Sequence, residues 1–124
     1  MPGLRFIRNS EEMPVAAGPR SRVAAYDLGS NSFHLLVAEA DGQGGLRLLE
    51  QAQEMVRLGA ESLRDGIIPE DGFARGLEDL RKLRGLADRH QPETTVAVAT
   101  SAIREARNGA EFVSAVEREV GLKV

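Results

Sequence analysis

The sequence predicts an α/β protein whose sheet begins as a three-stranded antiparallel meander and continues through a helix, a strand and a second helix. Two apolar runs flank a short polar bend in "VAAYDLGSNSFHLLVAEA", residues 23–40, and a glycine-rich turn separates the second run from a third. Apolar residues then recur at helical spacing on both sides of the small-residue run "TTVAVAT". Because a helix leads into that strand, the sheet is expected to be mixed.

The meander occupies the first half of the chain. Residues 23–28 form a nearly continuous apolar run, typical of a strand buried on both faces, and residues 33–40 form a second run of this kind. The turn signal "DGQGG" at 41–45 precedes a more polar third strand at 46–53, which we expect at an edge of the sheet. Residues 1–20 combine Gly, Pro and scattered charge without a period, which indicates a flexible tail.

A helix is expected to follow the meander. Pro69 with two acidic neighbours suits a first helical turn, and Pro92 places the end of the helix near His90. Its apolar stripe consists of Phe73, Leu77, Leu80, Leu83 and Ala87. Three glycines interrupt the helix at a cost of about 1 kcal/mol each relative to Ala. Close packing against the sheet accounts for Gly76, whereas the sequence gives no reason for Gly72 or Gly85.

The remaining elements are a strand and a second helix. Residues 94–100 read as a buried strand of small residues. Asn108 followed by Glu111 resembles a capping box that opens a helix over 108–120, and Gly121 supplies its end. A further strand is expected to begin at Leu122, so the sequence reads as cut inside an element.

The overall composition excludes several classes of protein. The chain of 124 residues contains no Cys, which excludes disulfides and thiolate metal sites and favours the cytoplasm. A net charge of -3, from 16 basic and 19 acidic residues, argues against broad nucleic-acid binding. No apolar run approaches the roughly 18 residues that span a bilayer, and the start of the chain does not read as a signal peptide.

The bend "DLGSNS" carries the chemistry of the first half. Gly29 permits close approach to the backbone, and both Gly29 and Asn31 tolerate left-handed geometry, so successive N–H groups can form an anion-binding nest. Ser30 and Ser32 add hydroxyl donors, and Asp27 can hold a hard cation through water. Asp, Gly, Ser and Asn are also the ordinary turn residues. The pattern alone therefore leaves a phosphate loop and a plain hairpin bend open.

Three segments in order resemble one known family. "AAYDLGSNSFHLLVA" at 24–38 resembles the first phosphate motif of the exopolyphosphatase / guanosine pentaphosphate phosphohydrolase family, and "VRLG" at 56–59 and "VATSAIREARNGAEFV" at 98–113 resemble further family segments. The similarity covers about residues 23–124. It implies a ribonuclease H-like, actin-like half-domain, as in sugar kinases, with residues 21–124 forming the N-terminal part of a first actin-like domain truncated before its last strand.

The resemblance implies a hydrolase that uses Mg²⁺ or another divalent cation. The parent protein would be a cytoplasmic, homodimeric exopolyphosphatase that releases terminal phosphate from polyphosphate or guanosine pentaphosphate. It would bind no nucleic acid and no membrane. A kinase of the same fold and a phosphate- or alarmone-binding module without catalysis remain alternatives.

The resemblance also assigns roles to individual residues. Asp27, Gly29, Ser30, Asn31 and Ser32 would contact phosphate, with Asp27 near the cation. Arg104 would face the active cleft, where its planar fork suits phosphate oxygens, although a surface position at a helix entry is the ordinary interpretation of such a residue. Arg57 has a weaker claim, since an arginine on an edge strand is usually solvated. Tyr26 departs from the aliphatic residue usual before the aspartate.

No catalytic residue is assigned within this chain. The water-activating glutamate of the family would lie beyond Val124, so the chain alone is expected to be inactive and to self-associate. His34 is expected to be a hydrogen-bonded structural residue, and His90 to interact with a helix C-terminus. Four glutamates are expected on a solvated helix face: Glu105, Glu111, Glu117 and Glu119.

Overall fold

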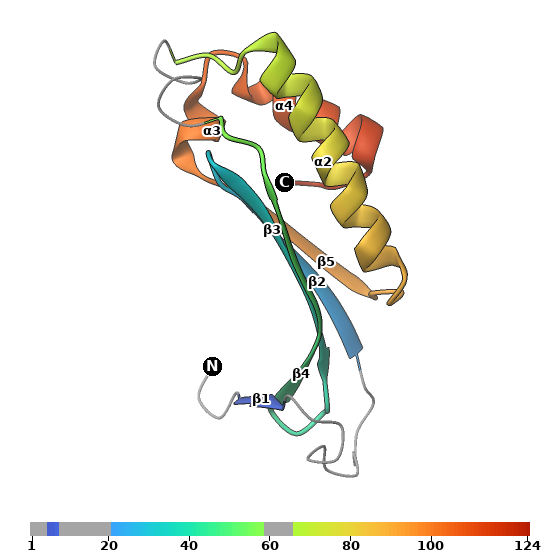
Figure 1. The fold of residues 1–124 in the computed structure, drawn as a ribbon. Coiled ribbons are helices and arrows are strands. Elements are labelled where there is room, and N and C mark those ends of the chain that lie inside the picture. Colours follow the sequence, from blue (N-terminus) through green and yellow to red (C-terminus); the bar gives the residue numbers. More distant parts are fainter. Residues whose placement is uncertain (1–4, 8–20, 59–65) are drawn as a thin grey trace.

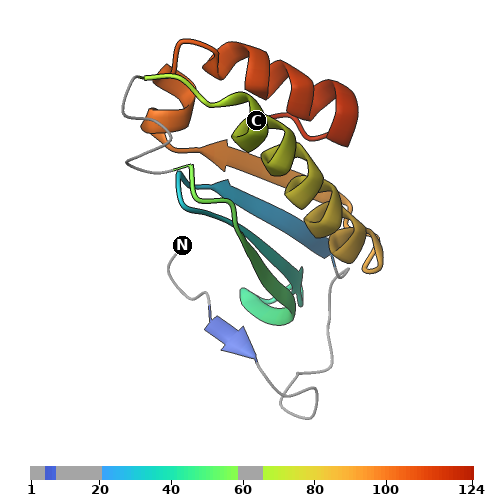
Figure 2. The same cartoon turned by 45° about the horizontal axis from the view of Figure 1, so that its top comes forward.

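A five-stranded mixed sheet with helices packed on one face forms the described part of the chain (Figure 1). The computed structural model describes residues 5–7, 21–58 and 66–124. The strands are β1 (Arg5–Ile7), β2 (Ser21–Leu28), β3 (Ser32–Ala40), β4 (Gly45–Met55) and β5 (Thr94–Ala99), and they lie in the order β1-β4-β3-β2-β5. Both views place α2 (Glu70–Asp88) and α4 (Gly109–Ala115) on the same side of the sheet (Figures 1 and 2). The predicted α/β class and the helical crossover before β5 are therefore confirmed.

The antiparallel meander has the predicted order and turn. It consists of β2 (Ser21–Leu28), β3 (Ser32–Ala40) and β4 (Gly45–Met55). At the turn between β3 and β4, the Asp41 carboxylate accepts the N–H groups of Gln43 at 2.7 Å and Gly45 at 3.0 Å. Gly42 and Gly44 adopt φ values of 81° and 86°, which favour glycine there.

The described helices cover one face of the sheet, which corrects the expectation that β2 is buried on both faces. Ala24, Tyr26 and Leu28 are at most 2% exposed, whereas Ala25 and Asp27 alternate with them on the opposite face. Because α2 and α4 lie on a single side, apolar residues of the other face stay open. We call that other side of the sheet the open face.

The strand β5 (Thr94–Ala99) pairs in parallel with β2 and is an edge of the described sheet. It was expected to be buried, and this expectation is wrong. Val96 is 49% and Val98 54% exposed on the open face, while Ala97 lies in the core. Small and β-branched residues made β5 read as an interior strand, although the described residues cover only one of its faces.

The long helix α2 (Glu70–Asp88) begins after Pro69 and ends before His90, as predicted. Its buried stripe includes Leu77, Leu80, Leu83 and Ala87, and the half-buried Phe73 packs against the core. A Cβ at Gly76 would lie 3.1 Å from Phe112 of α4 and 3.5 Å from Phe33 of β3. Both the neighbouring helix and the sheet therefore limit the space at this glycine. A Cβ at Gly72 would lie 2.6 Å from Leu58, which explains a glycine that the sequence left unexplained.

The chain after β5 forms a short helix α3 (Ser101–Glu105), a helix α4 (Gly109–Ala115) and a π-helical turn η2 (Val116–Val120). The helix predicted over 108–120 is confirmed, with this change of winding at Val116, and Gly121 ends it at φ 80°. The short helix α3 was not predicted. Arg84 of α2 donates to the carbonyl oxygens of Val120 at 2.7 Å and Gly121 at 2.8 Å.

The predicted capping box at Asn108 is absent. The Asn108 side chain makes no cap bond to α4 and instead accepts the Ile68 N–H and donates to the Ile68 carbonyl, both at 2.8 Å. A side-chain amide matches a peptide unit in this way because it presents one donor and one acceptor side by side. Asn108 thus ties the entry of α2 to the entry of α4.

Both ends of the chain differ from expectation. Within the predicted tail, β1 (Arg5–Ile7) pairs in parallel with the start of β4, so the first residues of β4 are not an edge, and the remainder of the tail lies outside the described residues. Residues 122–124 form no strand, and Leu122 is 1% exposed within the core. No helix in the described ranges is long and apolar enough to cross a membrane.

Candidate functional site

Three chain segments meet around the bend "DLGSNS", at the end of the sheet where β2, β4 and β5 finish. The bend joins β2 to β3, and the last residues of β5 lie beside the last residues of β2 because the two strands are parallel. β4 runs antiparallel to β3, so Met55 lies opposite Ser32. The bend, the residues after β4 and the residues after β5 are therefore neighbours in space.

Backbone hydrogen bonds hold the bend from both sides. The Arg57 N–H donates to the Asn31 carbonyl at 2.8 Å, and the Thr100 N–H donates to the Leu28 carbonyl at 3.1 Å. Within the bend, the Gly29 N–H donates to the Ser32 carbonyl at 3.0 Å. A Cβ at Gly29 would lie 2.9 Å from that same Ser32 oxygen. Glycine is thus required here by close approach of the backbone.

The left-handed geometry expected at Gly29 and Asn31 is not observed. Among described residues, positive φ values belong to other glycines and to Arg57 and Gln91. The bend nevertheless leaves donors available. The N–H groups of Ser30 and Asn31 donate to no acceptor in the described part of the chain, and Ser30 is half-buried. Two free amides at a fixed turn can bind an anion.

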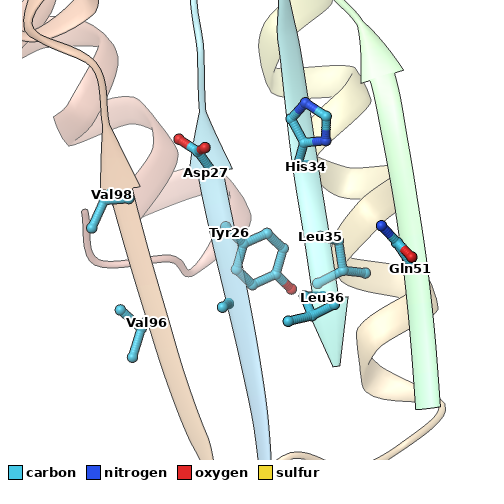
Figure 3. Close-up of a pocket in the computed structure, with 9 residues that line it drawn as sticks. Tyr26, Asp27, His34, Leu35, Leu36, Gln51, Val96 and Val98 are labelled. Atoms are coloured by element: carbon cyan, nitrogen blue, oxygen red, sulfur yellow. The ribbon is translucent and has the colours of Figure 1, made fainter. Parts of the chain in front are cut away.

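Asp27 and His34 lie directly opposite each other on β2 and β3, and both side chains are exposed on the open face. They stand at one end of a shallow groove of about 310 Å³ (Figure 3). Further along the groove its lining includes Ala25, Leu36, Val96 and Val98. No group of three or more His, Cys, Asp or Glu side chains able to hold a metal ion occurs in the described ranges. Asp27 therefore offers a single carboxylate ligand from this region.

His34 is hydrogen-bonded, as predicted, but it is not part of the core. Its Nε2 atom lies 2.9 Å from the Ser32 hydroxyl oxygen. The residues that fill the core from β3 are its alternate neighbours Phe33 and Leu35, which face the helices. The apolar letters around His34 concealed this alternation, because both faces of β3 carry apolar residues.

Two arginines border the bend. Arg104 lies on α3, and its Nε atom donates to the Ala99 carbonyl at 3.0 Å, which fixes the side chain beside the end of β5. Arg57 adopts φ 53°, a left-handed conformation uncommon for a residue with a side chain, between the fully buried Val56 and Leu58. Such strained positions occur preferentially at functional sites. Gly59 of the same motif lies outside the described residues.

The sequence did not single out two residues that support this site. Arg75 of α2 donates to the Val56 carbonyl from Nη2 at 2.9 Å and from Nε at 3.3 Å, and so holds the segment after β4. The Thr100 hydroxyl is buried at the junction of β5 and α3 and has no hydrogen-bond partner among the described residues. Both residues lie where segments distant in sequence meet. Thr100 falls within the motif at 98–113, whereas no local pattern indicates Arg75.

The other predicted candidates lie away from the bend. His90 follows α2 and contacts Glu50 of β4, with Nε2 and Oε1 3.2 Å apart. The His90 carbonyl oxygen accepts a hydrogen bond from Arg22 at the start of β2, which is the end of the strand opposite the bend. The four glutamates of the last helices are exposed as expected, and Glu119 forms an ion pair with Arg81 at 3.1 Å.

Comparison with known proteins identifies the family. The model of the Ppx/GppA phosphatase family matches residues 36–124. The chain belongs to the Ppx/GppA phosphatase family. The match includes Arg57 and Arg104 and begins after the bend, so the roles of residues 27–32 rest on their own geometry and on the motif.

Solved structures agree with this membership. A Ppx/GppA family member from Aquifex aeolicus is 37% identical with a TM-score of 0.76, and the match covers 84% of this chain and 34% of that protein. An exopolyphosphatase from Cytophaga hutchinsonii is 30% identical with a TM-score of 0.77, over 84% of this chain and 33% of that protein. This chain thus spans about a third of the length of these Ppx/GppA proteins. Their actin-like fold confirms the fold class expected from the resemblance.

Proposed function

We propose that this chain is the phosphate-binding portion of an exopolyphosphatase-type phosphohydrolase. The proposal rests on the bend at residues 29–31. Backbone hydrogen bonds fix the bend from two sides, and the N–H groups of Ser30 and Asn31 donate to no acceptor among the described residues. Arg104 beside the bend adds a planar cation suited to phosphate oxygens. Free amides, hydroxyls and a guanidinium around one edge favour a phosphoanhydride over an uncharged substrate.

The substrate class follows from the same donors and from the family. Terminal phosphate groups of inorganic polyphosphate or guanosine pentaphosphate present the oxygens that the bend would bind. The description of the Cytophaga hutchinsonii relative as an exopolyphosphatase favours polyphosphate-type substrates. Cleavage would take place in the cytoplasm, in keeping with a sequence without Cys.

A divalent cation such as Mg²⁺ would bind beside Asp27. A lone exposed carboxylate fits this ion, because Mg²⁺ keeps several waters and is commonly held by one or two carboxylates together with substrate phosphates. The cation would neutralise charge on the phosphoryl oxygens. Asp27 and Arg104 would then approach the phosphate from the ends of neighbouring strands.

The 124-residue chain alone is expected not to release phosphate. Hydrolysis of a phosphoanhydride needs an aligned water and charge stabilisation on both sides of the phosphoryl group. The bend, Asp27 and Arg104 supply one side. The lone carboxylate at this edge of the described sheet also makes a non-catalytic phosphate-binding module the second candidate function.

The test is binding of tripolyphosphate to the chain, followed by the amide NMR signals of Ser30 and Asn31 with and without Mg²⁺. We expect saturable shifts of these two signals, and weaker binding in Arg104→Met. Arg89→Met is the matched control, since this exposed arginine follows α2 at the far edge of the sheet. Absence of binding, or equal loss in both variants, would refute the proposed phosphate site.

A further inference from the structure

The Ser32–His34 contact joins the bend to a side chain to which the resemblance assigns no role in phosphate binding. Ser32 is the first residue of β3, and His34 lies two residues later on the same face of the strand. Their Oγ and Nε2 atoms are 2.9 Å apart, a normal hydrogen-bond distance. The ring is exposed, so the contact does not serve to fill the core.

The direction of this hydrogen bond decides what Ser32 offers to an anion. A serine hydroxyl has one hydrogen and two lone pairs, whereas each ring nitrogen of histidine either donates or accepts. If the Ser32 hydroxyl donates to Nε2, it presents only lone pairs to a phosphate. If Nε2–H donates to the Ser32 oxygen, the Ser32 hydrogen is free to donate to a phosphate oxygen.

We propose that His34 is a positioning residue of the phosphate bend and acts by donating its Nε2–H to the Ser32 hydroxyl oxygen. This inference rests on the proposed phosphate site and adds a specific determinant of its affinity. The neutral ring provides this donor in one of its two tautomers, so no change of charge is needed. Bound phosphate selects that tautomer, because only then does Ser32 donate to the anion.

His34 lies beside the candidate cation ligand as well as beside the bend. The groups directly opposite its ring on the open face are Asp27 of β2 and Gln53 of β4. Figure 3 shows Asp27 and His34 on adjoining strands at the same end of the groove. His34 thus connects the candidate cation ligand with the bend.

A double-mutant cycle separates positioning from a general structural effect. Calorimetric titration with tripolyphosphate is carried out on the wild-type chain, His34→Ala, Ser32→Ala and the double variant. We expect His34→Ala to weaken binding about fivefold, as for the loss of one hydrogen bond. In the Ser32→Ala background, His34→Ala should have no further effect. His34→Gln, whose amide can donate at the same reach, should restore affinity to within about twofold of wild type.

The controls distinguish the possible failures. His90→Ala removes the other histidine, at the far edge of the sheet, and should leave affinity unchanged. Urea denaturation should give the same midpoint for wild type and His34→Gln. If wild type binds but His34→Ala binds equally well, or if its effect persists without the Ser32 hydroxyl, the positioning role is wrong. If wild type itself binds no tripolyphosphate, the proposed phosphate site fails and this inference fails with it.

Discussion

Tyr26 directly precedes Asp27, and its side chain lies on the opposite face of the sheet, under α2. It is 2% exposed, so the core accommodates this tyrosine. Burial raises its pKa to about 12, while Arg84 partly opposes this and Asp88 adds to it. The fold thus favours the neutral phenol of Tyr26 on the helix-covered face, while the charged Asp27 lies on the open face.

We expect this pKa to make the fold sensitive to alkali. Below pH 10 the phenol is neutral in both the folded and the unfolded chain. Above pH 10 the unfolded chain loses the proton first, so the free energy of unfolding falls until the pH reaches about 12. The loss is on the order of 2 kcal/mol. Urea denaturation between about pH 8 and pH 11.5 should show this decline in wild type and a smaller one in Tyr26→Phe. Equal declines would contradict the assignment.

Asp27 is predicted to couple phosphate binding to the cation. A unit charge and a divalent ion about 4 Å apart attract each other by about 2 kcal/mol in water. Mg²⁺ is expected to raise the affinity for tripolyphosphate. In Asp27→Asn this gain in affinity should be at least about tenfold smaller than in the wild-type chain. Affinity without Mg²⁺ should stay the same or increase, since a negative charge is removed. Asp88→Asn, at the far end of α2, serves as the control, and an undiminished Mg²⁺ effect in Asp27→Asn would rule out the cation role.

The sequence identified the residues of the bend but not how they are used. The bend is recognisable in the sequence because few short segments place a carboxylate, a glycine and two hydroxyl groups directly after a strand. These residues are Asp27, Gly29, Ser30 and Ser32. The reason for Gly29 differs from the expected one, since it is the approach of the Ser32 oxygen and not left-handed geometry. The positions of Arg75 and Thr100 depend on the tertiary fold, which local patterns do not contain.

At the scale of elements, the glycines of α2 test how the helix packs. A Cβ at Gly76 would lie 3.1 Å from Cζ and 3.2 Å from Cε1 of Phe112. The Phe112 ring is fully buried and packs edge-on against Phe73 at 5.1 Å, so it has little room to move. A Cβ at Gly85 would meet no described atom within 4 Å.

These two glycines should therefore respond to alanine in opposite directions. Gly76→Ala should destabilise the fold by about 1 to 2 kcal/mol, because the added methyl overpacks the core. Gly85→Ala should stabilise it by about 0.5 to 1 kcal/mol, since alanine restricts the unfolded chain and suits an exposed helix. Chemical denaturation of both variants provides the measurement. A stabilising Gly76→Ala would show that the α2–α4 contact is looser than the structure describes.

The order and approximate bounds of the elements could be predicted from sequence, whereas burial and capping could not. Periodicity and the turn residues located β2, β3, β4, α2 and β5. The exposure of Val98 depends on how many faces of the sheet are covered, which a run of small apolar residues does not specify. Asn108 was assigned a local cap, but its partner Ile68 lies 40 residues away in sequence.

At the scale of the whole molecule, the two sides of the sheet differ in how they meet other chains. Beyond the residues that pair with β1, β4 carries charged side chains, including Glu50 and Glu54. The strand β5 contains only Thr, Val and Ala, and no described strand lies on its far side. An uncharged apolar edge is a template for pairing with another strand, whereas charges discourage it.

We therefore predict that the 124-residue chain self-associates through β5. Light scattering over a concentration series should give a mass that rises above the 13.4 kDa of one chain. Val98→Lys should restore the mass of a single chain, because a charge at this 54% exposed position must be desolvated on pairing. Gln53→Lys introduces the same charge on β4 and should leave association unchanged. A wild-type chain that is monomeric at every concentration would contradict the predicted self-association. Equal dissociation by both lysine variants would show that β5 is not the contact, because an interface formed by β5 should respond to a charge on β5 and not to one on β4.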